Sequence, residues 1–98
     1  MATQADLNII REIILSRLQD HPVKVYLFGS HATGRAAPAS DIDVAILPEG
    51  SLPTGLLSRV REEIENSNVP YRVDLVDLSQ TDEAFRRRVL NEGIRWTA

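Results

Sequence analysis

The chain has 98 residues, of which 43% are hydrophobic and 26% charged, with no cysteine and a net charge of −3. These values predict one ordered domain and exclude a disordered chain, a disulfide framework and a thiolate metal site. No apolar run approaches the roughly 20 residues that span a bilayer, and no secretory signal is visible, so we expect a cytoplasmic protein that binds no membrane. The acidic balance argues against an extended nucleic-acid surface, which needs a basic face. A small anionic ligand, with its charge offset by a metal, remains compatible.

The first half of the chain predicts a helix, a strand, a loop and a second strand. Apolar residues at helical spacing indicate a helix over residues 6–18, with Asp6 as its N-cap. A β-prone run over residues 23–28 predicts a strand that stops at Gly29. Residues 29–40 predict a loop with a helical turn in its first half, and residues 41–47 a second strand. Because this loop is too short for a crossover helix, the two strands are expected to pair antiparallel.

The second half predicts a helix over residues 52–67, a third strand over 71–78 and a last helix from an N-cap at Ser79 to about Asn91. Gly93 is the expected C-cap of that helix. Residues 94–96 form either a short strand or a docking tail. The third strand follows a helix, so it is expected to run parallel to one of the others. This order predicts an α+β fold, a mixed β-sheet with helices packed on one side.

Two aspartates at the start of the second strand carry the strongest chemical signal. Asp41 and Asp43 are two residues apart, and such residues of a strand point to the same face with Cα atoms roughly 6.5–7 Å apart. Two ionised carboxylates aimed together repel each other, so one takes up a proton unless a cation is present. A hard, oxygen-loving cation such as Mg²⁺ removes that conflict, and the pair therefore predicts a magnesium site.

A glycine–serine turn and a third aspartate extend this candidate site. Gly29 lets a ligand approach the backbone closely, and Ser30 offers a hydroxyl and an N–H that can cradle phosphate. Asp74 lies between apolar residues of the third strand, where an acid is costly to bury unless it is paired or bound to a metal. If the third strand lies beside the second, Asp74 completes a two-metal site or acts as a general base.

Gly29-Ser30, then ten residues, then Asp41-x-Asp43 and a later Asp74 resemble the motifs of the DNA polymerase β-like nucleotidyltransferase superfamily. More narrowly, the chain resembles the minimal nucleotidyltransferases, and the similarity extends over nearly its whole length, including residues 85–93. The resemblance implies that Asp41, Asp43 and Asp74 are the catalytic metal ligands. It also implies that Gly29 and Ser30 bind the triphosphate of the substrate ATP.

The spacing of the two motifs is also similar to that of MntA-type antitoxins, whose partners are α-helical HEPN toxins. This resemblance implies transfer of AMP from ATP to a tyrosine of a HEPN toxin. Two alternatives stay open: a non-catalytic module that neutralises its partner by contact, and nucleotidyl transfer to a small molecule. Since 98 residues leave little room to enclose both nucleotide and acceptor, an oligomer or a partner chain is expected to complete the site.

Other residues near the motifs each have a structural and a functional interpretation. Arg35 and Ser40 are candidate nucleotide ligands in the loop, or simply a solvated arginine and a turn hydroxyl. His31 is expected at the surface rather than in a nucleotide pocket, and Asp77 is expected to cap a turn. Trp96 is either a core residue or an exposed interface anchor.

The basic run at residues 86–88 is expected to form a solvated helix face. The alternative, functional interpretation is a basic patch that binds an acidic partner or the triphosphate.

Overall fold

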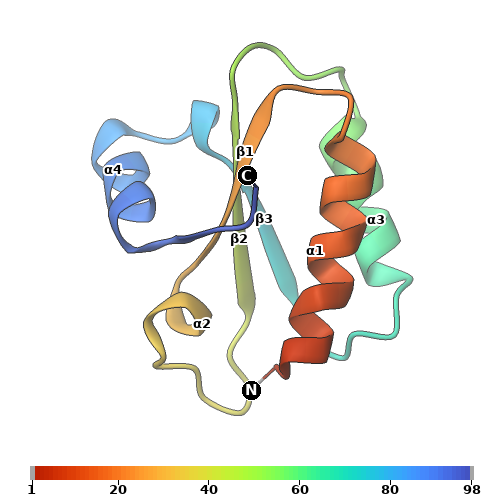
Figure 1. Ribbon diagram of the computed structural model, residues 1–98, viewed down its shortest axis with the longest axis vertical. Coiled ribbons are helices and arrows are strands. Elements are labelled where there is room, and N and C mark those ends of the chain that lie inside the picture. Colours follow the sequence, from red (N-terminus) through yellow and green to blue (C-terminus); the bar gives the residue numbers. More distant parts are fainter. Residues whose placement is uncertain (1, 98) are drawn as a thin grey trace.

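The computed structural model describes residues 2–97 and consists of a four-stranded sheet with helices on both faces (Figure 1). The elements run in the order α1 (Gln4–Leu18), β1 (Val23–Phe28), α2 (Ser30–Thr33), β2 (Ile42–Pro48), α3 (Leu56–Glu65), β3 (Val73–Asp77), the 3₁₀ segment η1 (Leu78–Gln80), α4 (Glu83–Glu92) and β4 (Ile94–Arg95). The predicted helical turn in the first loop is the short helix α2. Among residues 2–97, no helix has both the length and the apolar character required to cross a membrane.

The sheet has the strand order β3-β2-β1-β4. Strands β1 and β2 pair antiparallel, as their short connection predicted. Strand β3 pairs parallel with β2 after the crossover through α3. The C-terminal residues add β4 antiparallel to β1, so the tail is a strand at one edge of the sheet.

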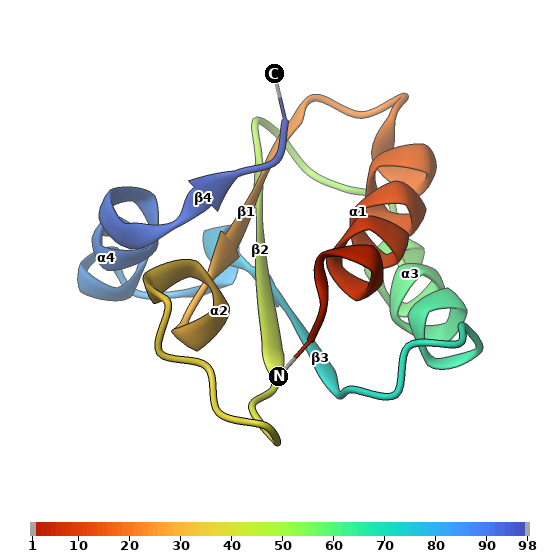
Figure 2. The same ribbon diagram turned by 60° about the horizontal axis from the view of Figure 1, so that its bottom comes forward.

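Helices α1 and α3 lie side by side on one face of the sheet, and α4 lies on the other (Figure 2). Alternation along β1 sends Val25 and Leu27 toward α1 and α3, and Tyr26 toward α4. The α+β class with a mixed sheet is confirmed, but the prediction of helices on one side alone is wrong. The reason is that α4 also has an apolar stripe, which packs on the opposite face around Val89.

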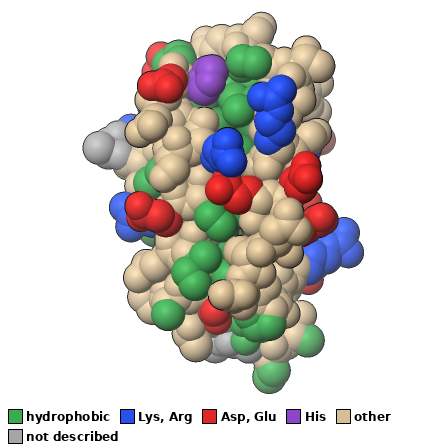
Figure 3. Space-filling model, turned by 90° about the vertical axis from the view of Figure 1, so that its right-hand side faces the viewer, with side chains coloured by type: hydrophobic (Ala, Val, Ile, Leu, Met, Phe, Trp, Pro, Cys, Tyr) green, Lys and Arg blue, Asp and Glu red, His purple; other side chains and the backbone are tan. Residues whose placement is uncertain are grey.

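The outer surface of helices α1 and α3 is exposed to solvent. Acidic and basic side chains are interspersed over it rather than gathered by sign (Figure 3). Arg17 of α1 and Glu63 of α3 form an ion pair at 2.7 Å between the two helices. Because both side chains are largely exposed, this pair contributes little to stability.

Two predicted helix caps are displaced by a few residues. Thr3, not Asp6, is the N-cap of α1, and Asp6 completes a capping box by accepting from the Thr3 backbone N–H. Asp82, not Ser79, caps α4, because residues 78–80 form a separate 3₁₀ turn. Gly93 is the C-cap of α4, as predicted.

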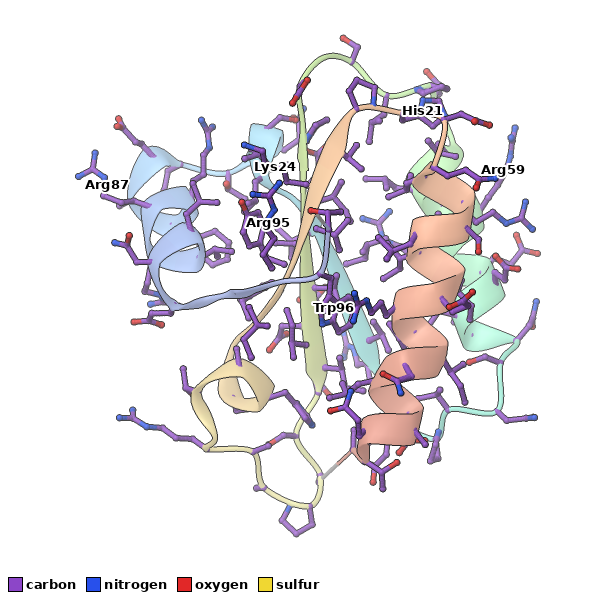
Figure 4. All side chains as sticks on the ribbon, in the orientation of Figure 1. His21, Lys24, Arg59, Arg87, Arg95 and Trp96 are labelled. Atoms are coloured by element: carbon purple, nitrogen blue, oxygen red, sulfur yellow. The ribbon has the colours of Figure 1, made fainter. Side chains whose placement is uncertain are left out.

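Trp96 is a core residue and not an exposed anchor. Its side chain is 7% exposed and packs in the cluster beneath α1, between that helix and the sheet (Figure 4). Its backbone N–H donates to the Val25 carbonyl at 2.8 Å, and its carbonyl accepts from Arg11 Nη2 at 3.1 Å. The segment after β4 is therefore attached to both β1 and α1.

Replacing Trp96 with alanine should lower the free energy of unfolding by about 3–5 kcal/mol, because a large buried ring is removed. Ile94→Ala is the matched control, since Ile94 is 48% exposed in the same segment, and its effect should stay within about 0.5 kcal/mol. Urea denaturation measures both. Equal effects of the two substitutions would contradict the core position of Trp96.

Candidate active site

The parallel pairing of β2 and β3 brings two predicted site residues together. Asp43 and Asp74 are register partners in this pair, so their Cα atoms are separated by about one strand spacing, roughly 4.8 Å, and their side chains share a face. Asp41 lies two residues before Asp43, just outside the first residue of β2. The three carboxylates therefore belong to one end of the sheet, on the face that also carries α4.

Gly29 lies directly against the Asp43 carboxylate. Phe28, the last residue of β1, is the register partner of Asp43, which places the following turn beside that side chain. A Cβ on Gly29 would overlap Asp43 Oδ2. The backbone of Gly29, with φ 73° and ψ −154°, is also in a region that is essentially restricted to glycine. Both the close approach and the backbone conformation explain why this position is a glycine.

The electrostatics of Asp43 reflect this convergence of acids. Its pKa is raised, first because the carboxyl is partly buried and then because the Asp74 and Asp41 carboxylates lie nearby. Like charges and desolvation both disfavour the ionised form. The structure thus holds an acid in a place where its charge is unfavourable without a compensating cation.

The donor set of the site suits Mg²⁺ in chemistry, since it consists of carboxylate oxygens. Within residues 2–97, no group of three or more His, Cys, Asp or Glu side chains is arranged to hold a metal by itself. Magnesium sites at nucleotides commonly use one or two carboxylates and complete the shell with phosphate oxygens and water. Asp41 and Asp43 fit that pattern, which requires no closed cage of protein ligands.

The environment of Asp74 differs from the one that the sequence predicted. The sequence predicted an acid inside an apolar strand, whereas Asp74 is exposed on the edge strand β3. Its neighbours Val73 and Leu75 point to the opposite face, where they pack with the core. No burial penalty therefore acts on Asp74, and its carboxylate is accessible from outside the sheet.

A cavity of about 440 Å³ lies at this edge of the sheet, between α3 and β3. It is lined by Asp74, by Tyr71 and Arg72 just before β3, and by Arg61 and Ile64 of α3, among other residues. Arg61 Nη2 donates to the Leu75 carbonyl at 2.8 Å, which covers part of the strand edge. Because Val73 and Leu75 face α3 whereas the Asp74 side chain points to the other face of the sheet, this cavity does not open onto the Asp74 carboxylate.

The remaining candidates are placed as follows. Asp77 caps the 3₁₀ turn, since its Oδ1 accepts from the Ser79 N–H at 2.9 Å, which confirms the turn-capping prediction. Ser40 Oγ accepts from the Ala37 N–H at 2.7 Å and so closes the loop before Asp41. Arg35 is exposed just after α2. Neither Ser40 nor Arg35 is brought to the carboxylates by a contact within the described residues.

In the basic run of α4, Arg87 and Arg88 are exposed, as the predicted solvated face requires, whereas Arg86 is half-buried. Arg86 Nε donates to the Leu78 carbonyl at 3.2 Å. Arg87 forms an exposed pair with Glu83 and points away from the sheet (Figure 4). Arg88 lies over the ring of Phe85 at 5.8 Å.

The Phe85 ring in turn meets Phe28, the residue before Gly29, edge to face at 5.8 Å. This aromatic contact connects α4 to the turn that borders the carboxylates.

His31 forms hydrogen bonds that the sequence did not predict. Its Nδ1 lies 3.0 Å from the Asp41 carbonyl, and its Nε2 accepts from the Ala2 N–H at 3.3 Å. The expected surface histidine is half-buried. Its position directly after Gly29-Ser30 was the only available signal, and spacing alone does not reveal two hydrogen bonds to distant backbone groups.

The mixed sheet thus brings acids of two adjacent parallel strands beside a glycine turn. The model of the polymerase β nucleotidyltransferase family matches residues 8–96. The chain therefore belongs to this family of enzymes.

Individual relatives agree with this assignment. The chain is 37% identical over 81 residues to "Probable protein adenylyltransferase MntA" of Haemophilus influenzae, covering 83% of this chain and 69% of that protein. It is similar to a solved minimal nucleotidyltransferase with 31% identity and a TM-score of 0.72, covering 90% of each chain. It is also similar to a chain in a crystal structure of a toxin–antitoxin with AMP-PNP, with 27% identity, a TM-score of 0.70, and 90% and 73% coverage of this chain and that chain.

Gly29→Ala should lower the free energy of unfolding by about 1–3 kcal/mol, because its backbone conformation suits glycine alone. It should also weaken binding of Mn²⁺, used as a spectroscopic substitute for Mg²⁺, because the new Cβ displaces the Asp43 carboxylate. Gly34→Ala is the control: Gly34 also has a positive φ, 76°, but no neighbour within 4 Å of an added Cβ. Gly34→Ala should lower stability without changing Mn²⁺ affinity, and a loss of affinity in both variants would contradict the contact with Asp43.

Asp43→Asn should raise the melting temperature at pH 7. The pKa of Asp43 is raised in the folded protein, so ionisation destabilises the fold at pH values above that pKa. Below the ordinary aspartate pKa of about 3.9, Asp43 is protonated in both states and the difference between variant and wild type should vanish. Thermal unfolding followed by circular dichroism from pH 3 to pH 7 measures this. A destabilised variant at pH 7 would show that the Asp43 charge is instead favourable.

Proposed function

We propose that this protein transfers AMP from ATP to a tyrosine hydroxyl of a partner HEPN toxin, with Mg²⁺ as its cofactor, and so acts as an antitoxin. The observation that carries this proposal is the register of β2 against β3, which pairs Asp43 with Asp74. The antiparallel pairing of β1 with β2 sets Gly29 beside Asp43, and Asp41 lies two residues before Asp43. A metal-binding acid pair, a turn for phosphate and an accessible acid for the acceptor therefore lie at one end of the sheet.

Asp41 and Asp43 would hold Mg²⁺ together with phosphate oxygens of the nucleotide. Bound Mg²⁺ supplies charge neutralisation at the triphosphate and at the departing pyrophosphate. The Gly29–Ser30 turn lies against Asp43 and has no side chain at Gly29, so a triphosphate near Asp43 can extend over the turn. The chain itself thus contributes mainly orientation and electrostatic preorganisation.

Asp74 acts on the acceptor side of the reaction. The hydroxyl oxygen of the acceptor attacks the α-phosphorus of ATP, and the bond from that phosphorus to the oxygen bridging to the β-phosphate breaks. Asp74 takes the hydroxyl proton, and pyrophosphate leaves with the bond electrons. This role is supported by the exposure of Asp74 on the edge strand β3, where a side chain of another molecule can reach its carboxylate.

A protein acceptor is supported by similarity and by the shape of the chain. The relative from Haemophilus influenzae has the name of a protein adenylyltransferase, and another similar chain comes from a toxin–antitoxin structure with an ATP analogue. Asp74 is exposed on the edge strand β3. A partner protein that packs against this edge can bring an acceptor hydroxyl to the Asp74 carboxylate.

Incubation of the protein with ATP, Mg²⁺ and its HEPN partner should increase the intact mass of the partner by AMP units. The double variant Asp41→Asn with Asp43→Asn should reduce this transfer by at least about 10²-fold, because it removes the charges that hold the metal. Mass spectrometry of the partner measures the transfer. Asp77→Asn is the matched control, since Asp77 caps η1, and it should transfer AMP as the wild type does.

The same variants separate catalysis from simple binding. If the double variant still neutralises the partner toxin, the protein acts by contact and the enzymatic proposal is wrong. If the wild type modifies a small hydroxyl compound but never the partner, the acceptor class is wrong while the chemistry stands.

A further inference from the structure

His31 joins three segments that are distant in the chain. It lies in α2, two residues after Gly29, and hydrogen bonds to the backbone of Asp41 and of Ala2. Ala2 is 5% exposed and packs in the core beneath α1. The first turn of α1, the helix α2 and the start of β2 meet at this end of the sheet (Figure 1).

The two hydrogen bonds determine the tautomer of the imidazole. Nε2 accepts from the Ala2 N–H at 3.3 Å, so it carries no proton. The proton of the neutral ring is therefore on Nδ1, which donates to the Asp41 carbonyl at 3.0 Å. Each ring nitrogen has one backbone partner, and the ring orientation is determined from both sides.

The bond to Asp41 matters because this aspartate is outside regular structure. Strand β2 begins at Ile42, and the Asp41 side chain is exposed. The loop before it is closed by bonds between Ala37 and Ser40, which connect the loop to itself. His31 instead connects the Asp41 carbonyl to α2, the helix that begins at the Gly29 turn.

We propose that His31 is a positioning residue: its Nδ1–H holds the Asp41 backbone at a set place relative to the Gly29–Ser30 turn, so that Asp41 and Asp43 can share one cation. This inference rests on the proposed function for its catalytic consequence. The hydrogen bond from the Ala2 N–H orients the imidazole ring, while the hydrogen bond to the Asp41 carbonyl positions a proposed metal ligand. The two bonds therefore have separable effects.

Two amide substitutions test the bonds one at a time. The amide of His31→Asn takes the place of Nδ1 and can still donate to Asp41, but it cannot reach Ala2. The amide of His31→Gln takes the place of Nε2 and can accept from Ala2, but it leaves the Asp41 carbonyl without its donor. Each variant loses one hydrogen bond, so a merely structural role predicts similar losses in both.

His31→Gln should lower Mn²⁺ affinity and kcat for AMP transfer by about 10–100-fold, the usual effect of losing a group that orients a metal ligand. His31→Asn should keep both near the wild-type values. Thermal unfolding of the two variants should show similar losses of stability. KM for the acceptor should not change in either variant, because the acceptor meets Asp74 and not Asp41.

Mn²⁺ titration by electron paramagnetic resonance, with and without ATP, keeps this test independent of AMP transfer. If the wild type binds Mn²⁺ but transfers no AMP, the proposed function fails, and the affinities of the two variants still decide the role of His31. Equal affinities in both variants would overturn the role of His31, whatever the transfer assay gives. If His31→Gln does not fold, His31→Asn decides alone, because a loss of Mn²⁺ affinity in that variant contradicts the proposal.

Discussion

The candidate site depends on one pairing, that of β2 with β3 in parallel. The register of this pair sets Asp43 beside Asp74, and a shift by one residue would send one carboxylate to the opposite face. The apolar residues between the acids hold the register, since Ile42, Val44 and Leu75 are buried under α1 and α3. The core on one face thus determines where the acids lie on the other.

This arrangement places like charges together, at a cost in stability. Partial burial and two neighbouring carboxylates raise the pKa of Asp43, an unfavourable situation that a bound cation relieves. Gly29 allows the closest approach, because any side chain there would occupy the position of the Asp43 carboxylate. The strained Gly29 backbone and the repulsion between carboxylates thus occur at the same end of the sheet. Such a concentration of strain and like charge is common at functional sites.

Helix α4 and the segment that follows it support the site without supplying a carboxylate to it. Helix α4 packs on the same face as Asp43, and the contact of Phe85 with Phe28 reaches the residue before Gly29. Trp96 closes the core on the other face: its backbone N–H donates to β1, and its carbonyl accepts from the Arg11 side chain of α1. Both faces of β1 are therefore packed, which holds the Gly29–Ser30 turn that follows this strand in place.

The sequence alone determined the strands and the principal helices, and it singled out Gly29, Ser30, Asp41, Asp43 and Asp74 as candidate site residues, because strand alternation, helical periodicity and short motifs are local properties of a chain. The placement of α4 on a second face, the exposure of Asp74, the contact of Gly29 with Asp43 and the two bonds of His31 were decided only by tertiary structure. Each of these joins segments far apart in the chain, and no local pattern specifies which of several possible neighbours a strand or side chain will meet. The physical reason is that such neighbours are selected by the packing of the whole core and by strand register.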